Sequence, residues 1–251
     1  MSSSIWTRCA ERCRSRRLRL TPWRVVEAQH LVSTRKLVDS LEEQALLEQL
    51  IDTAKPPARA AGRLHVLLAT PFRYPPLPYG SRFGTRHEPG IWYGSETRRT
   101  LFAEMAYYRF VFLEGTTADL GELITWHTAF TVRVRTGRGV DLTMRPFDAD
   151  RSVIASKTDY AAAQALGAAM RADGVEAFRY PSARDVEGGV NIGVFTSTVF
   201  GGAPPRQFET WHCTATRHRV EVVRRDFFEE AAFTFARLDF LVAGSLPAPA
   251  V

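Results

Sequence analysis

Three arginines in an aromatic, glycine-containing stretch are the side chains of this sequence best suited to binding a ligand. Arg73, Arg82 and Arg86 lie between residues 70 and 90, and Tyr93 and Glu104 follow them. A planar, permanently charged guanidinium matches the oxygens of a phosphate, and aromatic rings suit a heterocyclic base. A phenol and a carboxylate would be brought to the same place. This combination predicts a nucleotide pocket.

The common nucleotide-binding and metal-binding motifs are missing. The sequence contains neither Gly-x-Gly-x-x-Gly nor Gly-x-x-x-x-Gly-Lys-Ser/Thr, so neither a Rossmann nor a P-loop cradle is expected. Cys9 and Cys13 would need two further ligands to hold a metal, and none is close in the sequence, so we expect no metal ion. The segment Trp211-His212-Cys213 carries no nucleophile signature. Four histidines lack the His-Glu-x-x-His spacing and are interpreted as structural: His87, His127, His212 and His218.

Four sequence blocks, taken in order, resemble those of RES-domain toxins. The arginine, tyrosine and glutamate blocks are Gly80-Ser81-Arg82-Phe83-Gly84, Trp92-Tyr93-Gly94-Ser95 and Phe102-Ala103-Glu104, with eleven residues from Arg82 to Tyr93 and eleven from Tyr93 to Glu104. The fourth block, residues 173–195, is similar to the family's Tyr-Pro-Ser segment and places Ser182 at its serine position. The resemblance covers roughly residues 64–200. It departs at Arg82-Phe83-Gly84, where the family often has Arg-Trp-Asn.

The resemblance implies a fold related to ADP-ribosyltransferases and cleavage of the bond between nicotinamide and ribose in NAD. NAD would be the substrate, with no separate cofactor. By the same resemblance, Glu104 stabilises the positive charge that develops on the ribose, or holds a ribose hydroxyl. Arg82 binds the pyrophosphate, and Tyr93 positions the nicotinamide or its ribose. Ser182 hydrogen-bonds phosphate or ribose, and Asn191 in the following strand is a further substrate-binding candidate.

Several alternatives stay open at this point. Arg73 and Arg86 rival Arg82 as phosphate ligands. Water as acceptor would make a glycohydrolase, inorganic phosphate a phosphorylase, and a macromolecule an ADP-ribosyltransferase; a module that binds a nucleotide without turnover is a further alternative. The resemblance also implies a toxin that arrests growth by depleting NAD and is neutralised by a small Xre-like antitoxin. A homo-oligomer is left open.

The net charge of +6 is concentrated at one end of the chain. Residues 1–24 hold seven arginines and one glutamate, so the remainder is formally neutral. A short basic tail, which we expect to be solvated or disordered, does not favour a nucleic-acid partner. The chain has no apolar run long enough for a membrane helix and no secretory signal, and its three cysteines suit a reducing compartment. We therefore expect a soluble, cytoplasmic protein with no membrane partner.

We divide the chain into residues 1–60, a basic tail plus an amphipathic helix at 34–53, and a catalytic domain at 61–251. Apolar periodicity predicts a buried strand at 65–69 and a strand at 90–94. A helix is expected from 96 to about 109 and would be capped by Ser95. Strands at 124–134 and 139–142 would pair around a turn at 136–139.

The second half of the chain completes the prediction of the fold class. An alanine-rich helix is expected at 160–171 and would end at Asp173-Gly174, and strands are expected at 177–180, 190–195 and 218–223. Strands outnumber helices and do not alternate with them regularly. The sequence therefore predicts an α+β fold with a mixed or mostly antiparallel sheet and flanking helices.

Overall fold

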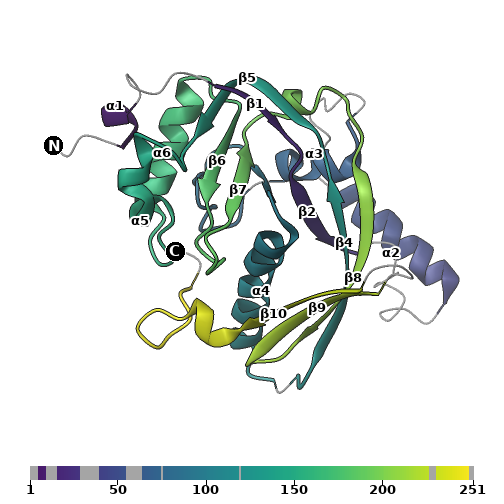
Figure 1. Cartoon of the computed structure of the whole chain (residues 1–251). Coiled ribbons are helices and arrows are strands. Elements are labelled where there is room, and N and C mark those ends of the chain that lie inside the picture. Colours follow the sequence, from purple (N-terminus) through teal and green to yellow (C-terminus); the bar gives the residue numbers. More distant parts are fainter. Residues whose placement is uncertain are drawn as a thin grey trace.

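One ten-stranded sheet organises the protein (Figure 1). The computed structural model describes residues 5–9, 16–28, 40–54, 64–74, 76–118, 120–225 and 230–248. The strand order is β1-β5-β6-β7-β3-β2-β4-β8-β9-β10. The strands are β1 (Arg16–Leu20), β2 (Trp23–Glu27), β3 (Trp92–Ser95), β4 (Leu123–Thr131), β5 (Val134–Asp141), β6 (Ala177–Pro181), β7 (Val190–Val194), β8 (Arg206–Ala215), β9 (Arg219–Arg225) and β10 (Glu230–Ala236). Neighbours pair antiparallel except β5 and β6, which confirms the predicted α+β class with a mixed, mostly antiparallel sheet.

The helices lie on both sides of this sheet. They are α1 (Ile5–Cys9), α2 (Leu41–Ala54), α3 (Val66–Arg73), α4 (Arg98–Glu114), α5 (Arg151–Ile154) and α6 (Ala161–Ala172), with 3₁₀ turns at Phe147–Asp150, Ser197–Phe200 and Arg237–Phe240. The predicted helix at 34–53 is present as α2, although residues 34–39 lie outside the described part. None of the described helices combines the length and the apolar character that crossing a membrane requires.

Helix α4 lies in the hollow of the curved sheet and touches strands from both of its halves (Figure 1). Thr97, not Ser95 as predicted, caps its first turn, because the Thr97 hydroxyl accepts a hydrogen bond from the amide of Thr100. Ser95 belongs to β3 instead. The helix also continues to Glu114, since its buried apolar face extends past residue 109 to Phe110. This face packs on β8 through Phe102, whose ring lies 4.6 Å from that of Trp211.

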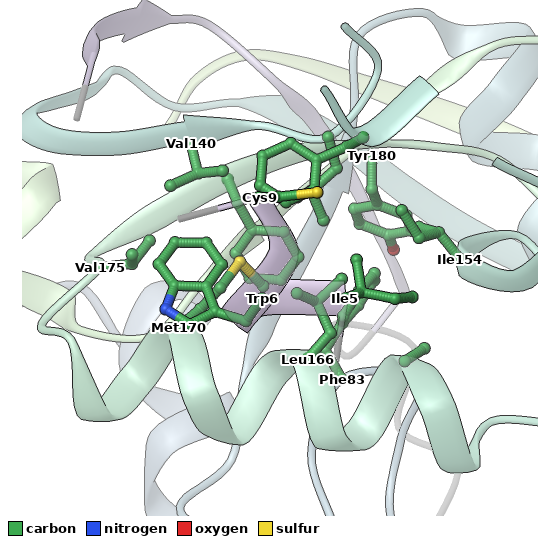
Figure 2. Packing of buried hydrophobic residues seen from close by; sticks show 14 of the residues in the cluster. Ile5, Trp6, Cys9, Phe83, Val140, Ile154, Leu166, Met170, Val175 and Tyr180 are labelled. Atoms are coloured by element: carbon green, nitrogen blue, oxygen red, sulfur yellow. The ribbon is translucent and has the colours of Figure 1, made fainter. Parts of the chain in front are cut away.

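The expectation of a solvated tail outside the sheet is wrong for residues 5–9 and 16–28. Ile5 and Trp6 of α1 are buried against α6, as Figure 2 shows, and the Trp6 indole donates a hydrogen bond to Asp173. Strand β1 pairs with β5, and β2 lies between β3 and β4. The arginines of β1 alternate with leucines, so Leu18 faces the core while Arg19 faces solvent.

Two further predictions in the sequence were wrong. Residues 66–73 form helix α3, not a strand, because the His65 side chain caps the Leu67 amide and the apolar residues follow a helical period, with Leu68 buried and Val66 exposed. Residues 136–139 are not a turn, since β5 runs through them and pairs with β1 and β6, not with β4. Gly139 permits that pairing, because a Cβ there would lie 2.3 Å from the Leu18 side chain.

The remaining predicted elements are present. Helix α6 ends at Ala172 and is followed by Asp173-Gly174, and strands β6, β7 and β9 lie at the predicted places. Strands β8 and β10 were not predicted from the sequence. They lie beyond β4 in the strand order, where the sheet continues around α4 (Figure 1). The curved sheet and α4 therefore enclose the space in which the predicted site residues lie.

Candidate functional site

A cavity of about 610 Å³ opens between α4 and strands β2, β3 and β7. Six of its lining residues are aromatic: Tyr93, Tyr107, Tyr108, Phe112, Tyr160 and Tyr180. Among the described residues, Glu104 is the only carboxylate that lines it, whereas four arginines do so: Arg24, Arg82, Arg109 and Arg184. A volume of this size is typical of small-molecule sites. The cavity thus combines rings, cations and a single carboxylate.

Glu104 is held by hydrogen bonds to one of its two oxygens. Its Oε1 accepts a hydrogen bond from the Ser182 hydroxyl at 2.6 Å and another from the Asn191 amide Nδ2 at 2.6 Å. Asn191 is oriented in turn, since its Oδ1 accepts a hydrogen bond of 2.6 Å from the Ser95 hydroxyl. Both partners are buried, and no hydrogen bond from a described residue reaches Oε2. The carboxylate is therefore fixed in direction and keeps one oxygen for a ligand.

Ser182 acts on this carboxylate from a tight turn after β6. Its Oγ also accepts hydrogen bonds from the amides of Arg184 at 3.1 Å and Asp185 at 3.0 Å. The hydroxyl proton is thereby directed to Glu104. Ser182 is buried and does not line the cavity, so the geometry favours a positioning role over the direct phosphate or ribose contact that the resemblance implied.

Arg82 lies in the cavity wall and is partly occupied by main-chain acceptors. Its Nη1 donates to the carbonyl of Ser156 at 2.6 Å and lies 3.4 Å from that of Ile154. The guanidinium carbon lies 4.5 Å from the centre of the Tyr160 ring. The turn that carries Arg82 packs on α6 at Gly167, where a Cβ would lie 1.9 Å from the carbonyl oxygen of Phe83.

The ring of Tyr93 lines the cavity, and its hydroxyl contacts the turn that carries Arg82. The phenol oxygen lies 2.9 Å from the Ser81 Oγ and accepts a hydrogen bond of 3.3 Å from the Phe83 amide. Burial raises the pKa of Tyr93 to about 12, so the phenol stays protonated at neutral pH. Its ring packs edge-on against Tyr180, at 6.2 Å between ring centres. Tyr93 thus offers an aromatic wall and orders the residues on either side of Arg82.

The other two predicted arginines do not line the cavity. Arg73 ends α3, where its guanidinium lies 5.9 Å from the ring of Tyr74. Arg86 is exposed, and its Nε lies 3.1 Å from a ring nitrogen of His87. The structure therefore brings together Arg82, Tyr93, Glu104, Ser182 and Asn191, and leaves Arg73 and Arg86 outside.

Three lining arginines were not singled out from the sequence: Arg24, Arg109 and Arg184. Arg24, in the supposed tail, reaches the cavity because β2 pairs with β3, and its Nη1 donates to the Tyr93 carbonyl at 2.6 Å. Its Nε is buried and has no hydrogen-bond partner in the part of the chain that the structure describes, and burial lowers the pKa of Arg24 to about 10, which leaves it charged at neutral pH. Arg184 follows Ser182 by two residues. The alternation in Trp23-Arg24-Val25 was the available signal for Arg24, and closeness to Ser182 for Arg184.

Metal ligands do not gather anywhere in the described part of the chain: no group of three histidine, cysteine, aspartate or glutamate side chains is close enough to hold an ion. The described cysteines, Cys9 and Cys213, are buried, and Cys13 lies outside the described residues.

Comparison with known proteins places the chain in a family. A search of curated proteins gave no match. The family model described as RES domain matches residues 56–215, which include Arg82, Tyr93, Glu104 and both partners of the Glu104 carboxylate. The match covers more than half of the chain and excludes β1, β2, β9 and β10. The chain therefore belongs to the RES domain family.

Proposed function

We propose that this protein is a toxin that cleaves the nicotinamide–ribose bond of NAD. The observation that carries the proposal is the fixed carboxylate of Glu104 in an aromatic cavity whose arginines outnumber carboxylates four to one. A dinucleotide supplies what this cavity lacks, namely negative charge for the guanidiniums and flat rings for the aromatic walls. Membership of the RES domain family agrees with an NAD-related activity.

The carboxylate suits the charge that this reaction creates. When the C–N bond breaks, the pyridinium nitrogen takes the bonding electron pair, and the ribose C1′ acquires oxocarbenium character. A preorganised carboxylate beside C1′ stabilises that positive charge without having to reorient during the reaction. The free Oε2 of Glu104 is the group available for this role, since Oε1 is already engaged by Ser182 and Asn191.

The acceptor that attacks C1′ decides the class of product. Water gives ADP-ribose, inorganic phosphate gives its 1-phosphate, and a macromolecular nucleophile would carry the ADP-ribose group; in each case the acceptor loses one proton. We propose water or inorganic phosphate, because a small acceptor needs only the space that nicotinamide vacates. Macromolecular transfer is the alternative outcome of the test.

Purified full-length protein incubated with NAD, with and without inorganic phosphate, tests the proposal. We expect stoichiometric release of nicotinamide together with ADP-ribose or ADP-ribose 1-phosphate. Radiolabel from NAD appearing on protein or nucleic acid instead would identify a transferase. Bound but intact NAD after prolonged incubation would contradict cleavage and indicate a binding module.

In the cell, we propose that the protein acts in the cytoplasm and is neutralised by a small Xre-like antitoxin. Expression alone should then lower cellular NAD and arrest growth, and co-expression with the antitoxin should restore both. A growth arrest that leaves NAD unchanged, or that the antitoxin does not relieve, would contradict this part of the proposal.

A further inference from the structure

Arg184 is a buried arginine of the cavity wall whose guanidinium is incompletely satisfied. Only 2% of the residue is exposed. Its Nη2 donates to the carbonyl of Lys157 at 3.1 Å and to the hydroxyl of Tyr160 at 3.1 Å. The guanidinium carbon lies 3.5 Å from the centre of the Tyr107 ring. Its Nη1 is buried and has no hydrogen-bond partner among the described residues.

The charge of Arg184 also lacks a partner. No carboxylate of the described residues lies within ion-pair distance of it, and the nearest acid in sequence is used elsewhere. Asp185 accepts a hydrogen bond from the Thr100 hydroxyl at 2.8 Å and lies 3.3 Å from the Arg99 Nε. Burying a cation without an anion is costly, and proteins normally pair or hydrogen-bond such a group fully. The unpaired guanidinium of Arg184 therefore points to an anionic ligand.

The position of Arg184 relates that ligand to the carboxylate. Its guanidinium stacks on Tyr107, which lies three residues after Glu104 on α4 and so on a neighbouring part of the helix surface. The same turn holds both groups, since Ser182 binds Glu104 and accepts the amide of Arg184. Arg184 and Glu104 thus line the same cavity and are connected through Ser182 and Tyr107.

Arg82 also lies beside Tyr160, but its Nη1 already donates to the main chain. Both arginines contact Tyr160, Arg184 at the hydroxyl and Arg82 over the ring. The Nη1 of Arg82 is already directed at two carbonyls, whereas that of Arg184 is free. A pair of guanidiniums on one tyrosine suits a diphosphate better than a single charge, because each planar fork can take oxygens of one phosphate.

We propose that Arg184 is a substrate-binding residue that holds the diphosphate of a nucleoside diphosphate, with Arg82 in support. This inference rests on the proposed function for the identity of the ligand, and it assigns the main diphosphate contact to a residue other than Arg82. The substrate class follows from it: a nucleotide that carries two phosphates between its ribose and the bond to be cleaved.

Binding of ADP-ribose to the full-length protein tests the inference without requiring catalysis. We expect Arg184→Gln to weaken ADP-ribose binding by roughly 10-fold or more in titration calorimetry, and to raise KM for NAD with little change in kcat. Binding of adenosine, which lacks the diphosphate, should not change. The matched control is Arg217→Gln, which removes an exposed arginine that also donates to two carbonyls, those of Thr116 and Ala118.

Other outcomes separate this inference from the proposed function. If Arg184→Gln does not fold, Arg184→Lys takes its place, since it keeps the charge but loses the planar fork, and it should still weaken ADP-ribose selectively. Equal weakening of ADP-ribose and adenosine, or unchanged ADP-ribose binding, would overturn the inference. ADP-ribose binding that depends on Arg184 in a protein that leaves NAD intact would support the inference and refute the proposed cleavage.

Discussion

Arginines outside the cavity and arginines lining it differ in how their charge is balanced. Several arginines outside the cavity are neutralised by carboxylates: Arg98 and Arg224 share the buried Glu209, at 2.5 and 2.8 Å, and Arg179 pairs with Asp141 and with Glu96. Lining the cavity, Arg24, Arg82 and Arg184 have no carboxylate partner among the described residues. Arg98, Arg179 and Arg224 are half-buried, and each has a carboxylate partner. The three lining arginines without a carboxylate partner therefore indicate that the cavity binds an anion.

Arg109 is the exception that sharpens this comparison. It lines the cavity, but its Nη2 is 2.8 Å from a carboxylate oxygen of Glu27, the last residue of β2. Because its charge is already compensated, we assign Arg109 to the framework. The comparison therefore separates the four lining arginines into three ligand candidates and one structural residue.

The largest effect on activity is expected from a substitution of Glu104, the single carboxylate among the described residues that line the cavity. Glu104→Gln keeps the shape and removes the negative charge, and we expect kcat for nicotinamide release to fall by about 100-fold or more. Glu114→Gln, on the same helix, is the matched control because that side chain pairs with Arg237 outside the cavity. Equal activity of the two variants would show that the carboxylate plays no part in the chemistry.

A smaller loss of activity is expected when Glu104 is kept but one of the hydrogen bonds that hold its carboxylate is removed. Asn191→Ala removes one of the two hydrogen bonds to the Oε1 of Glu104, and we expect kcat to fall by roughly 10-fold with KM nearly unchanged. Steady-state kinetics with NAD provides the measurement. If KM rises and kcat is preserved, Asn191 binds the substrate directly and does not position Glu104.

Removing an unpaired arginine from the N-terminal strand should affect binding. Arg24→Gln takes away a half-buried cation that has no carboxylate partner among the described residues, and we expect KM for NAD to rise by about 5-fold. Arg19→Gln, an exposed arginine of β1, should leave KM unchanged. A KM that does not respond to Arg24 would restrict the anion site to the arginines of the family-matched region.

The environment of His127, which includes Arg109, predicts an effect of pH on the stability of the folded protein. Burial, and then the charge of Arg109, lowers the pKa of His127 to about 4. Because the unfolded chain binds this proton more readily, the stability is complete above about pH 6.5 and declines as the pH falls toward 4. At pH 5.5 the loss from this residue should be about 1 kcal/mol.

Urea unfolding at pH 7.5 and pH 5.5 measures this loss, with His127→Gln as the comparison. The variant should lose less stability than the natural chain over the same interval. Identical losses would mean that folding does not lower the pKa of His127.

Much of the site could be predicted because its residues belong to local blocks on neighbouring elements. Tyr93 lies in strand β3, Glu104 lies on the helix that follows, and the Ser182 turn leads into the strand that carries Asn191. Each block reveals its element through a turn or a periodic pattern. Their convergence required only that β3 and β7 pair, as they do between Ser95 and Asn191.

The parts that could not be predicted depend on contacts between distant segments. Arg24 reaches the cavity only because β2 inserts between β3 and β4, whereas the seven arginines of residues 1–24 led us to expect a solvated tail. The hydrogen bonds of the Arg184 guanidinium depend on the loop at Lys157 and on Tyr160, which are separated from Arg184 by more than twenty residues. Charge compensation is a tertiary property, so no local pattern could identify the unpaired arginines.

The structure of Glu104→Gln crystallised with NAD tests the central claim most directly, because this variant should bind the substrate without consuming it. We predict that the nicotinamide ribose lies beside residue 104 and that the diphosphate lies within hydrogen-bond distance of the Nη1 of Arg184. NAD bound outside the cavity, or with its adenine end at residue 104, would contradict the account.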